Sequence, residues 1–161
     1  MTRGARARDL HPGEASGIIG WLFPLTYAVH LVEEYAAPEW FGAWSERVLG
    51  LAIGPREFIA WNALAFALMC AGTALSIAFS RLRWIEIAMS IGVLGNAMFH
   101  LAAGAATLTY SPGVVTGVLL WVPLGASRLW IGLRDCSPRG RRIGISVGVS
   151  AVLVSLGVLA S

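Results

Sequence analysis

A short segment near the start of the chain combines histidine with two carboxylates inside otherwise apolar sequence. It reads H-L-V-E-E-Y and contains His30, Glu33 and Glu34. If the segment is helical, offsets of three and four place both carboxylates on the same face as the imidazole, with Tyr27 one turn earlier on that face. Imidazole and carboxylate groups serve as metal ligands and as general acids or bases, so both kinds of chemistry are open.

A second segment reads N-A-M-F-H and places Asn96 four residues before His100, again on one face of a helix. Facing helices in bundles build metal sites from such nitrogen and oxygen donors, and zinc, iron or manganese would suit them. We therefore predict a mononuclear site for a divalent metal, with Asn96 orienting a ligand or substrate. The predicted metal ligands are His30, Glu33, Glu34 and His100. The predicted catalytic residues are His30, Glu33, Glu34 and Asn96.

Long apolar helices are the elements that must position these groups. Of 161 residues, 57% are hydrophobic and 13% are charged, and crossing about 30 Å of hydrocarbon takes about 20 helical residues. We predict an all-α, polytopic membrane bundle forming a single domain over residues 1–161, with about five spans at 17–36, 58–79, 84–108, 113–133 and 143–160. The last span contains Gly144 and Gly148 and is expected to be a peripheral helix that packs through small residues. Residues 38–51 are too short and too charged to span and are expected to lie on the outer surface.

The distribution of arginine predicts the orientation of the bundle. By the positive-inside rule the N-terminus is cytoplasmic, and the net charge of +3 belongs to flanks that face anionic lipid, not nucleic acid. Arginines precede the first span or lie in alternate connections, at Arg3, Arg6, Arg8, Arg81, Arg83, Arg134, Arg139, Arg141 and Arg142.

The depth of each polar residue decides whether these groups can meet. At 1.5 Å per residue, Asn62, His30 and His100 lie roughly 6, 9 and 12 Å below the outer ends of their spans. Trp121 falls at about the same level, beside Pro123, whose missing N–H is expected to disturb the helix. We therefore expect one shared pocket in the outer half of the membrane, with candidate substrate-binding residues Tyr27, Asn62, Tyr110 and Trp121.

The carboxylates of Glu33 and Glu34 lie near the end of their helix, where the negative pole of the helix dipole disfavours them. Compensation is expected from a bound cation, from a protonated imidazole, from Arg47 or Arg56, or from protonation of one carboxylate.

Other polar residues receive simpler interpretations. Glu86 and Arg128 lie near cytoplasmic helix ends, where long side chains reach the interface. Thr116 is near enough to reach the cluster, but we expect it to bond within its own helix. Cys70 and Cys136 lie too far apart for a disulfide.

Three motifs together resemble those of the HXXEE family of small bacterial membrane proteins. They are H-L-V-E-E at residues 30–34, the N-x-x-F-H-like element at 96–100 and Y-S-P-G at 110–113. The resemblance covers the first to the fourth predicted helix and implies a multi-pass protein of a bacterial inner membrane. It supports the histidine and glutamate site, but the family is named for its motif, so the reaction stays open.

Three functions fit these residues. The first is a membrane-embedded enzyme, such as a hydrolase, that acts on a small lipophilic substrate with a bound metal ion. The second is a metal-free isomerase or cyclase, in which a buried carboxylic acid protonates a double bond. The third is a proton-coupled carrier or binding protein; the short chain lacks the repeats of transporters, although a homodimer could supply the missing half. The expected partners are membrane lipid and substrate.

Overall fold

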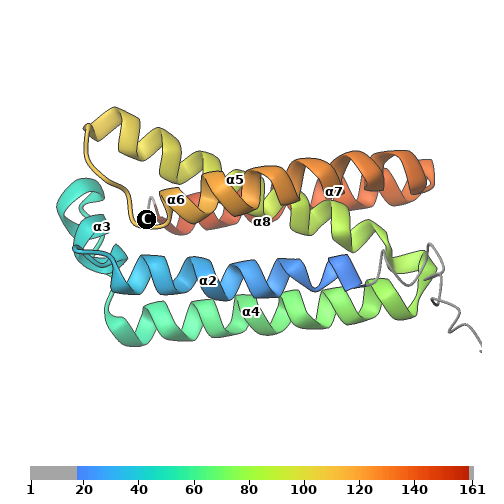
Figure 1. Cartoon of the computed structure of the whole chain (residues 1–161), viewed down its shortest axis with the longest axis horizontal. Coiled ribbons are helices and arrows are strands. Elements are labelled where there is room, and N and C mark those ends of the chain that lie inside the picture. The colour runs from blue at the N-terminus through green and yellow to red at the C-terminus, as the bar shows by residue number, and fades with distance from the viewer. Residues whose placement is uncertain (1–17, 160–161) are drawn as a thin grey trace, which may run out of the picture.

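The computed structural model describes residues 18–159, and every regular element within that range is a helix. Its long helices lie side by side along the longest axis of the molecule (Figure 1). A shorter helix, α3 (Phe41–Leu49), lies across one end of the bundle. The long helices are α2 (Leu22–Ala36), α4 (Pro55–Ala78), α5 (Trp84–Thr107), α7 (Val122–Asp135) and α8 (Pro138–Leu159).

Four segments of the described chain are long and apolar enough to cross a membrane, which identifies a multi-pass helical protein. They are Pro55–Ala78, Ser80–Thr107, Val114–Asp135 and Pro138–Gly157. These segments overlap the four later predicted spans, and α3 overlaps the predicted surface segment 38–51.

The first predicted span, 17–36, is represented by α2, which has 15 residues and is not among the four segments. Residue 17 and residue 160, the predicted limits of the first and last spans, lie outside the described residues. The N-terminal arginines Arg3, Arg6 and Arg8 also lie outside them.

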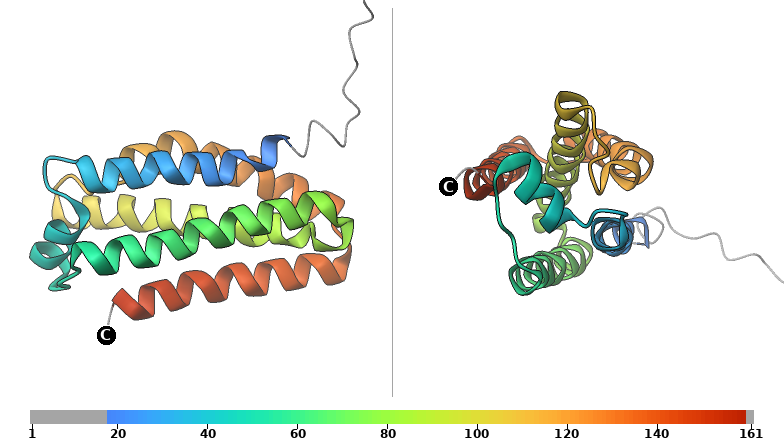
Figure 2. Two further views of the ribbon diagram at one scale, coloured as in Figure 1. Left: turned by 90° about the horizontal axis from the view of Figure 1, so that it is seen from below. Right: turned by 90° about the vertical axis from the view of Figure 1, so that its left-hand side faces the viewer.

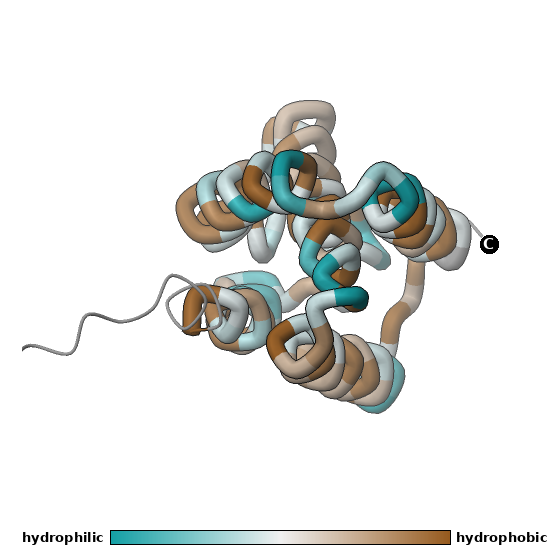
Figure 3. The backbone as a smooth tube through the Cα atoms, turned by 90° about the vertical axis from the view of Figure 1, so that its right-hand side faces the viewer, coloured by the Kyte–Doolittle hydropathy of each residue, from teal (hydrophilic) through white to brown (hydrophobic). Residues whose placement is uncertain are grey.

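Successive long helices run in opposite directions, so the connections gather at two ends (Figures 1 and 2). The α4–α5 connection at 79–83 and the α7–α8 connection at 136–137 lie at one end, which we call the basic end because arginines lie within or next to both connections. Helix α3 and the loop 108–113 lie at the other end, which we call the capped end. Seen from the basic end, hydrophobic residues extend along the helices and are interrupted by hydrophilic positions (Figure 3).

Helix α5 is the central element and packs against both α7 and α8. Its contact with α8 depends on small residues, as predicted: a Cβ atom on Gly144 would lie 2.8 Å from Ile87 Cβ, and one on Gly148 would lie 3.0 Å from the Ala88 carbonyl oxygen. Because these positions lack side chains, the two backbones can approach closely.

The fourth predicted span is not a continuous α-helix. It begins as α6 (Val114–Thr116), widens into a π-helical turn, η2 (Gly117–Trp121), and continues as α7. The wide turn ends just before Pro123, which cannot donate a backbone hydrogen bond. The helix is therefore irregular at the place where Pro123 was expected to disturb it. Such turns are frequent at functional sites, and this one carries Trp121.

The expectation that the side chains of Glu86 and Arg128 reach the membrane interface is wrong. Glu86 is 7% exposed and Arg128 is 2% exposed, and the two side chains form an ion pair between α5 and α7. Ser76 of α4 lies 3.5 Å from the same carboxylate. Both charges are buried because each compensates the other inside the bundle.

Candidate functional site

Three of the predicted site residues meet in the interior near the capped end. His30 and Glu34 come from α2 and His100 comes from α5, and their exposed fractions are 1%, 5% and 0%. The Nε2 atom of His30 lies 3.4 Å from Glu34 Oε1, and that of His100 lies 3.2 Å from the same oxygen. We call these three residues the His–Glu–His cluster.

The ring nitrogens that face Glu34 are not engaged in hydrogen bonds. Nε2 of His30 and Nε2 of His100 are both buried and have no hydrogen-bond partner. Buried polar atoms in proteins nearly always form a hydrogen bond, so two nitrogens that approach one carboxylate oxygen without forming one need an explanation. The ligand atoms of the cluster all lie within 4.8 Å of one another, and the cluster could hold a metal ion.

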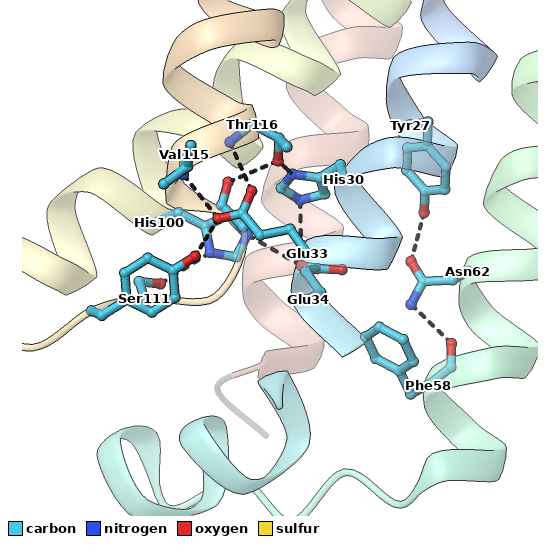
Figure 4. A network of polar contacts seen from close by, with 12 residues as sticks. Tyr27, His30, Glu33, Glu34, Phe58, Asn62, His100, Ser111, Val115 and Thr116 are labelled. Carbon is cyan, nitrogen blue, oxygen red and sulfur yellow. Dashed lines mark hydrogen bonds and ion pairs between the residues drawn. The ribbon is translucent and has the colours of Figure 1, made fainter. Parts of the chain in front are cut away.

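The other nitrogen of each imidazole is held by a hydroxyl group (Figure 4). Nδ1 of His30 lies 2.7 Å from Thr116 Oγ1, and Nδ1 of His100 lies 3.0 Å from Ser111 Oγ. Thr116 therefore does more than bond within its own helix, contrary to expectation. Metal-binding histidines are usually oriented in this way, by a partner on the ring nitrogen that does not face the metal.

Gly113 lets the loop 108–113 pass directly against both rings. A Cβ atom at this position would lie 2.7 Å from His30 Cε1 and 2.9 Å from His100 Cε1. Its φ of 99° is in the region that favours glycine. Each motif residue of Y-S-P-G other than the proline thus has a contact with the site: Tyr110 with Glu33, Ser111 with His100 and Gly113 with both imidazoles.

Glu33 does not join the cluster, although it was predicted as a metal ligand. Its carboxylate accepts hydrogen bonds from the backbone N–H groups of Val115 and Thr116, at 3.0 and 2.7 Å, and from the hydroxyl of Tyr110 at 2.6 Å. Because these three donors compensate its charge, no cation is needed at Glu33 (Figure 4). Glu34, by contrast, faces the two imidazoles of the cluster.

The two arginines considered as partners for the glutamates are engaged elsewhere or exposed. Arg47 forms a salt bridge with Glu39, at 2.5 and 2.8 Å, on the surface near the capped end. This guanidinium holds the pKa of the Glu39 carboxyl below its usual value, chiefly by hydrogen bonding. Arg56 is exposed in the first turn of α4.

Tyr27 and Asn62, predicted to bind substrate, are bonded to each other. The Tyr27 hydroxyl donates to Asn62 Oδ1 at 2.6 Å, and Asn62 Nδ2 donates to the Phe58 carbonyl at 2.8 Å, which links α2 to α4. The hydrogen-bonding capacity of both side chains is therefore largely used inside the protein (Figure 4).

Trp121 lies where the predicted depth places it. Its ring stacks on His30 with 3.8 Å between centroids and on Tyr27 with 5.8 Å. The indole N–H donates to Thr26 Oγ1 at 3.2 Å. Asn96 remains one turn before His100, and its Oδ1 is buried without a hydrogen-bond partner.

Helix α3 covers the cluster from the capped end with aromatic side chains. Phe41 meets His100 edge to face, with centroids 5.8 Å apart, and it packs with Trp44 and Phe58 in one apolar cluster. This cover keeps bulk water from the imidazoles, which strengthens electrostatic interactions in the site. Phe41, Ser111, Gly113 and Thr116 were not predicted as site residues, and for two of them the Y-S-P-G motif was the available signal.

One family of known proteins matches the chain over most of its length. The profile of this family, described as "Protein of unknown function with HXXEE motif", matches residues 21–127. The match contains all three members of the cluster as well as Glu33 and the loop 108–113. Searches of the curated proteins and of the solved structures find no match. The chain belongs to the HXXEE family.

Proposed function

We propose that this member of the HXXEE family is a membrane-embedded metalloenzyme whose metal ligands are His30, Glu34 and His100. The observation that carries the proposal is the pair of buried Nε2 atoms that face one carboxylate oxygen without a hydrogen bond. A divalent cation among these atoms would supply the missing partner of both imidazoles and balance the charge of Glu34.

The separations between the ligand atoms support a four-coordinate ion. Zinc binds nitrogen and carboxylate oxygen at about 2.0–2.1 Å, and tetrahedral geometry then separates neighbouring ligand atoms by about 3.3 Å. The two distances from Glu34 Oε1 to the imidazoles are 3.4 and 3.2 Å. We favour zinc over manganese or iron because two imidazole nitrogens and one carboxylate oxygen are a common ligand set of zinc, which binds few ligands, whereas manganese prefers more oxygen ligands.

A set of two histidines and one glutamate favours catalysis over a purely structural role. Structural zinc sites use four protein ligands, whereas catalytic sites use three and keep one position for water or substrate. Bound there, zinc would lower the pKa of a water molecule and polarise a substrate oxygen. The fourth predicted ligand, Glu33, is engaged by backbone donors and leaves that position open.

The surroundings of the cluster favour a small lipophilic substrate. The walls are aromatic and come from several helices: Phe41 of α3, Phe99 of α5 and Trp121 of η2 contact the imidazoles. Four candidate spans place the site in a protein that lies in lipid, from which an apolar substrate can enter. Hydrolysis is the reaction class that such a zinc site supports best.

Elemental analysis of detergent-purified protein tests the proposal. The wild-type protein should contain stoichiometric zinc, and Glu34→Gln and His100→Ala should lose it. Glu33→Gln should retain zinc under saturating conditions, because Glu33 is not a ligand. A wild-type protein that binds no divalent metal at micromolar concentration would overturn the proposal.

A metal-free acid and base enzyme, an isomerase or cyclase, is the second candidate. The observation that favours it is the stacking of Trp121 on His30 at 3.8 Å, because an indole face stabilises a protonated imidazole. In that case Glu34, as a carboxylic acid, would protonate a double bond of the substrate, and His30 would accept the proton that the substrate loses. Wild-type protein that lacks metal and still binds apolar amines as carbocation mimics would support this function.

The proposed location is a bacterial inner membrane with the basic end in the cytoplasm. The arginines that flank 79–83 and 136–137 support this orientation through the positive-inside rule. The His–Glu–His cluster would then lie in the outer half of the membrane. Labelling of single cysteines introduced at Gly50 and at Ser137, in a background in which Cys70 and Cys136 are replaced by serine, tests it. Only the cysteine at position 50 should react in intact cells with an impermeant reagent.

A further inference from the structure

The Thr116 hydroxyl lies between His30 and a carbonyl group, and this constrains where the ring hydrogen of His30 lies. Thr116 Oγ1 is 2.7 Å from His30 Nδ1 and donates to the Gly113 carbonyl oxygen at 3.4 Å. A threonine hydroxyl has a single hydrogen to donate. When that hydrogen is given to the carbonyl, the hydroxyl oxygen accepts from His30, and Nδ1 carries the hydrogen.

The position of this hydrogen determines what the opposite side of the ring can bind. A neutral imidazole has one N–H, so a hydrogen on Nδ1 leaves a lone pair on Nε2. Nε2 of His30 is the buried atom that lies 3.4 Å from Glu34 without a hydrogen bond. A lone pair next to a carboxylate suits the binding of a cation, whereas an N–H at Nε2 would block it.

Glu33 fixes the backbone of the residue that carries the hydroxyl. Its carboxylate accepts the N–H of Thr116 at 2.7 Å and that of Val115 at 3.0 Å, which anchors the start of α6 beside α2. Tyr110 donates to the same carboxylate at 2.6 Å and ties the loop to it. Glu33 thus reaches the imidazole only through Thr116.

We infer that Thr116 and Glu33 are positioning residues that hold His30 as the Nδ1–H tautomer, with its Nε2 lone pair directed toward Glu34. The two neighbouring carboxylates of the motif then have separate roles, since Glu34 binds the cation and Glu33 orients the residue behind the first imidazole. The inference rests on the proposed metal-binding function and deepens it.

Nitrogen NMR of metal-free protein in detergent tests the inference without any metal. The chain has three histidines, so ¹⁵N-histidine labelling gives few signals, and His11→Ala removes the one outside the cluster. In this background His30 should carry its hydrogen on Nδ1. Thr116→Val, which keeps the shape but removes the hydroxyl, should shift the hydrogen largely to Nε2, and Thr116→Ser should restore the wild-type tautomer.

Zinc titration of the same variants gives the second measurement. Loss of such an orienting partner lowers metal affinity about 10- to 100-fold, so we expect this for Thr116→Val, about tenfold for Glu33→Gln and at most about threefold for Thr116→Ser. The inference is overturned if wild-type His30 carries its hydrogen on Nε2, or if Thr116→Val changes neither tautomer nor affinity. If the wild type binds no zinc while His30 shows the expected tautomer and its dependence on the hydroxyl, the proposed metal function fails and the positioning role stands.

Discussion

Helix α5 carries a buried ionisable side chain toward each of its ends, and the two side chains have different partners. Toward the basic end, Glu86 pairs with Arg128 and is also approached by Ser76, so opposite charges compensate each other directly. Toward the capped end, His100 and His30 approach the single carboxylate of Glu34, and neither facing nitrogen forms a hydrogen bond. The side chains are similarly buried in the two places, but only Glu86 and Arg128 form an ion pair that is also hydrogen bonded.

Burial of a charge therefore does not by itself mark a functional site. A complete pair needs nothing further and holds two helices together. In the His–Glu–His cluster, by contrast, both Nε2 atoms face one carboxylate oxygen without a hydrogen bond and both Nδ1 atoms contact hydroxyl groups, and a bound cation there is the proposed function. Variants at the two places should therefore affect different properties, stability at the basic end and ligand binding at the capped end.

The largest expected effect is on metal binding by Glu34→Gln. Glutamine keeps the shape of the side chain but removes its charge, so zinc affinity should fall by about 10⁴-fold, about 5.6 kcal/mol at 1.4 kcal/mol per tenfold. The unfolding free energy of the metal-free protein should fall by much less than the free energy of zinc binding, because glutamine keeps the position of the side chain between the two imidazoles. Isothermal titration and unfolding in detergent measure both quantities.

Glu46→Gln is the matched control for this variant, since it removes a carboxylate that is exposed on α3. Its zinc affinity should equal that of the wild type. If Glu34→Gln still binds zinc as the wild type does, the contrast between the two regions disappears.

At the basic end, Glu86→Leu should lower the unfolding free energy by about 3–5 kcal/mol, because it removes the carboxylate that forms an ion pair with the buried Arg128. Zinc affinity of the folded protein should stay unchanged. Denaturant unfolding in detergent provides the measurement. The double variant Glu86→Leu, Arg128→Met also removes the buried guanidinium charge, so most of the lost stability should return. If the stability does not return, the loss in Glu86→Leu arose from packing.

Gly113→Ala should damage the capped end specifically. The new methyl group would meet both imidazoles, and alanine is strained at a φ of 99°, so we expect a loss of about 1–3 kcal/mol in zinc binding or stability. Gly92→Ala is the control, because a Cβ there meets nothing within 4 Å and the position is in the middle of α5. Equal behaviour of the two variants in zinc titrations would argue against close contact between the loop and the cluster.

The smallest effect concerns the hydroxyl of Tyr110. Burial and the hydrogen bond to Glu33 raise its pKa to about 12, above the ordinary value of about 10. Because the folded pKa is the higher one, the stabilisation is complete below about pH 10 and is lost as the pH rises toward about 12. Tyr110→Phe should therefore lower the unfolding free energy by about 0.5 kcal/mol at pH 8 and by nothing near pH 12.

Tyr35→Phe is the control for this measurement, because Tyr35 contacts its neighbours through its ring, which the variant keeps. It should show no such dependence on pH. A pH-independent effect of Tyr110→Phe would indicate that the ring of Tyr110, and not its hydroxyl, stabilises the loop.

The fold could largely be predicted because hydropathy and helix length are local properties. The predicted spans 58–79 and 84–108 correspond to α4 (Pro55–Ala78) and α5 (Trp84–Thr107) within a few residues. Much of the cluster was also predictable, since spacing placed His30 and Glu34 on one face and depth placed His100 at their level. The burial of Glu86 and Arg128 could not be predicted, because a position near a helix end does not show whether the side chain faces lipid or a neighbouring helix.

An apolar helical bundle and the set of side chains available for chemistry follow from the sequence alone, because helical periodicity and the cost of burying polar groups act within each segment. The role of each neighbouring glutamate follows only from the way the helices pack. Glu33 and Glu34 are about 100° apart around their helix, so one faces the start of α6 and the other faces His100. Which carboxylate meets backbone donors and which meets imidazoles depends on how α2 is rotated against its neighbours, and packing sets that rotation.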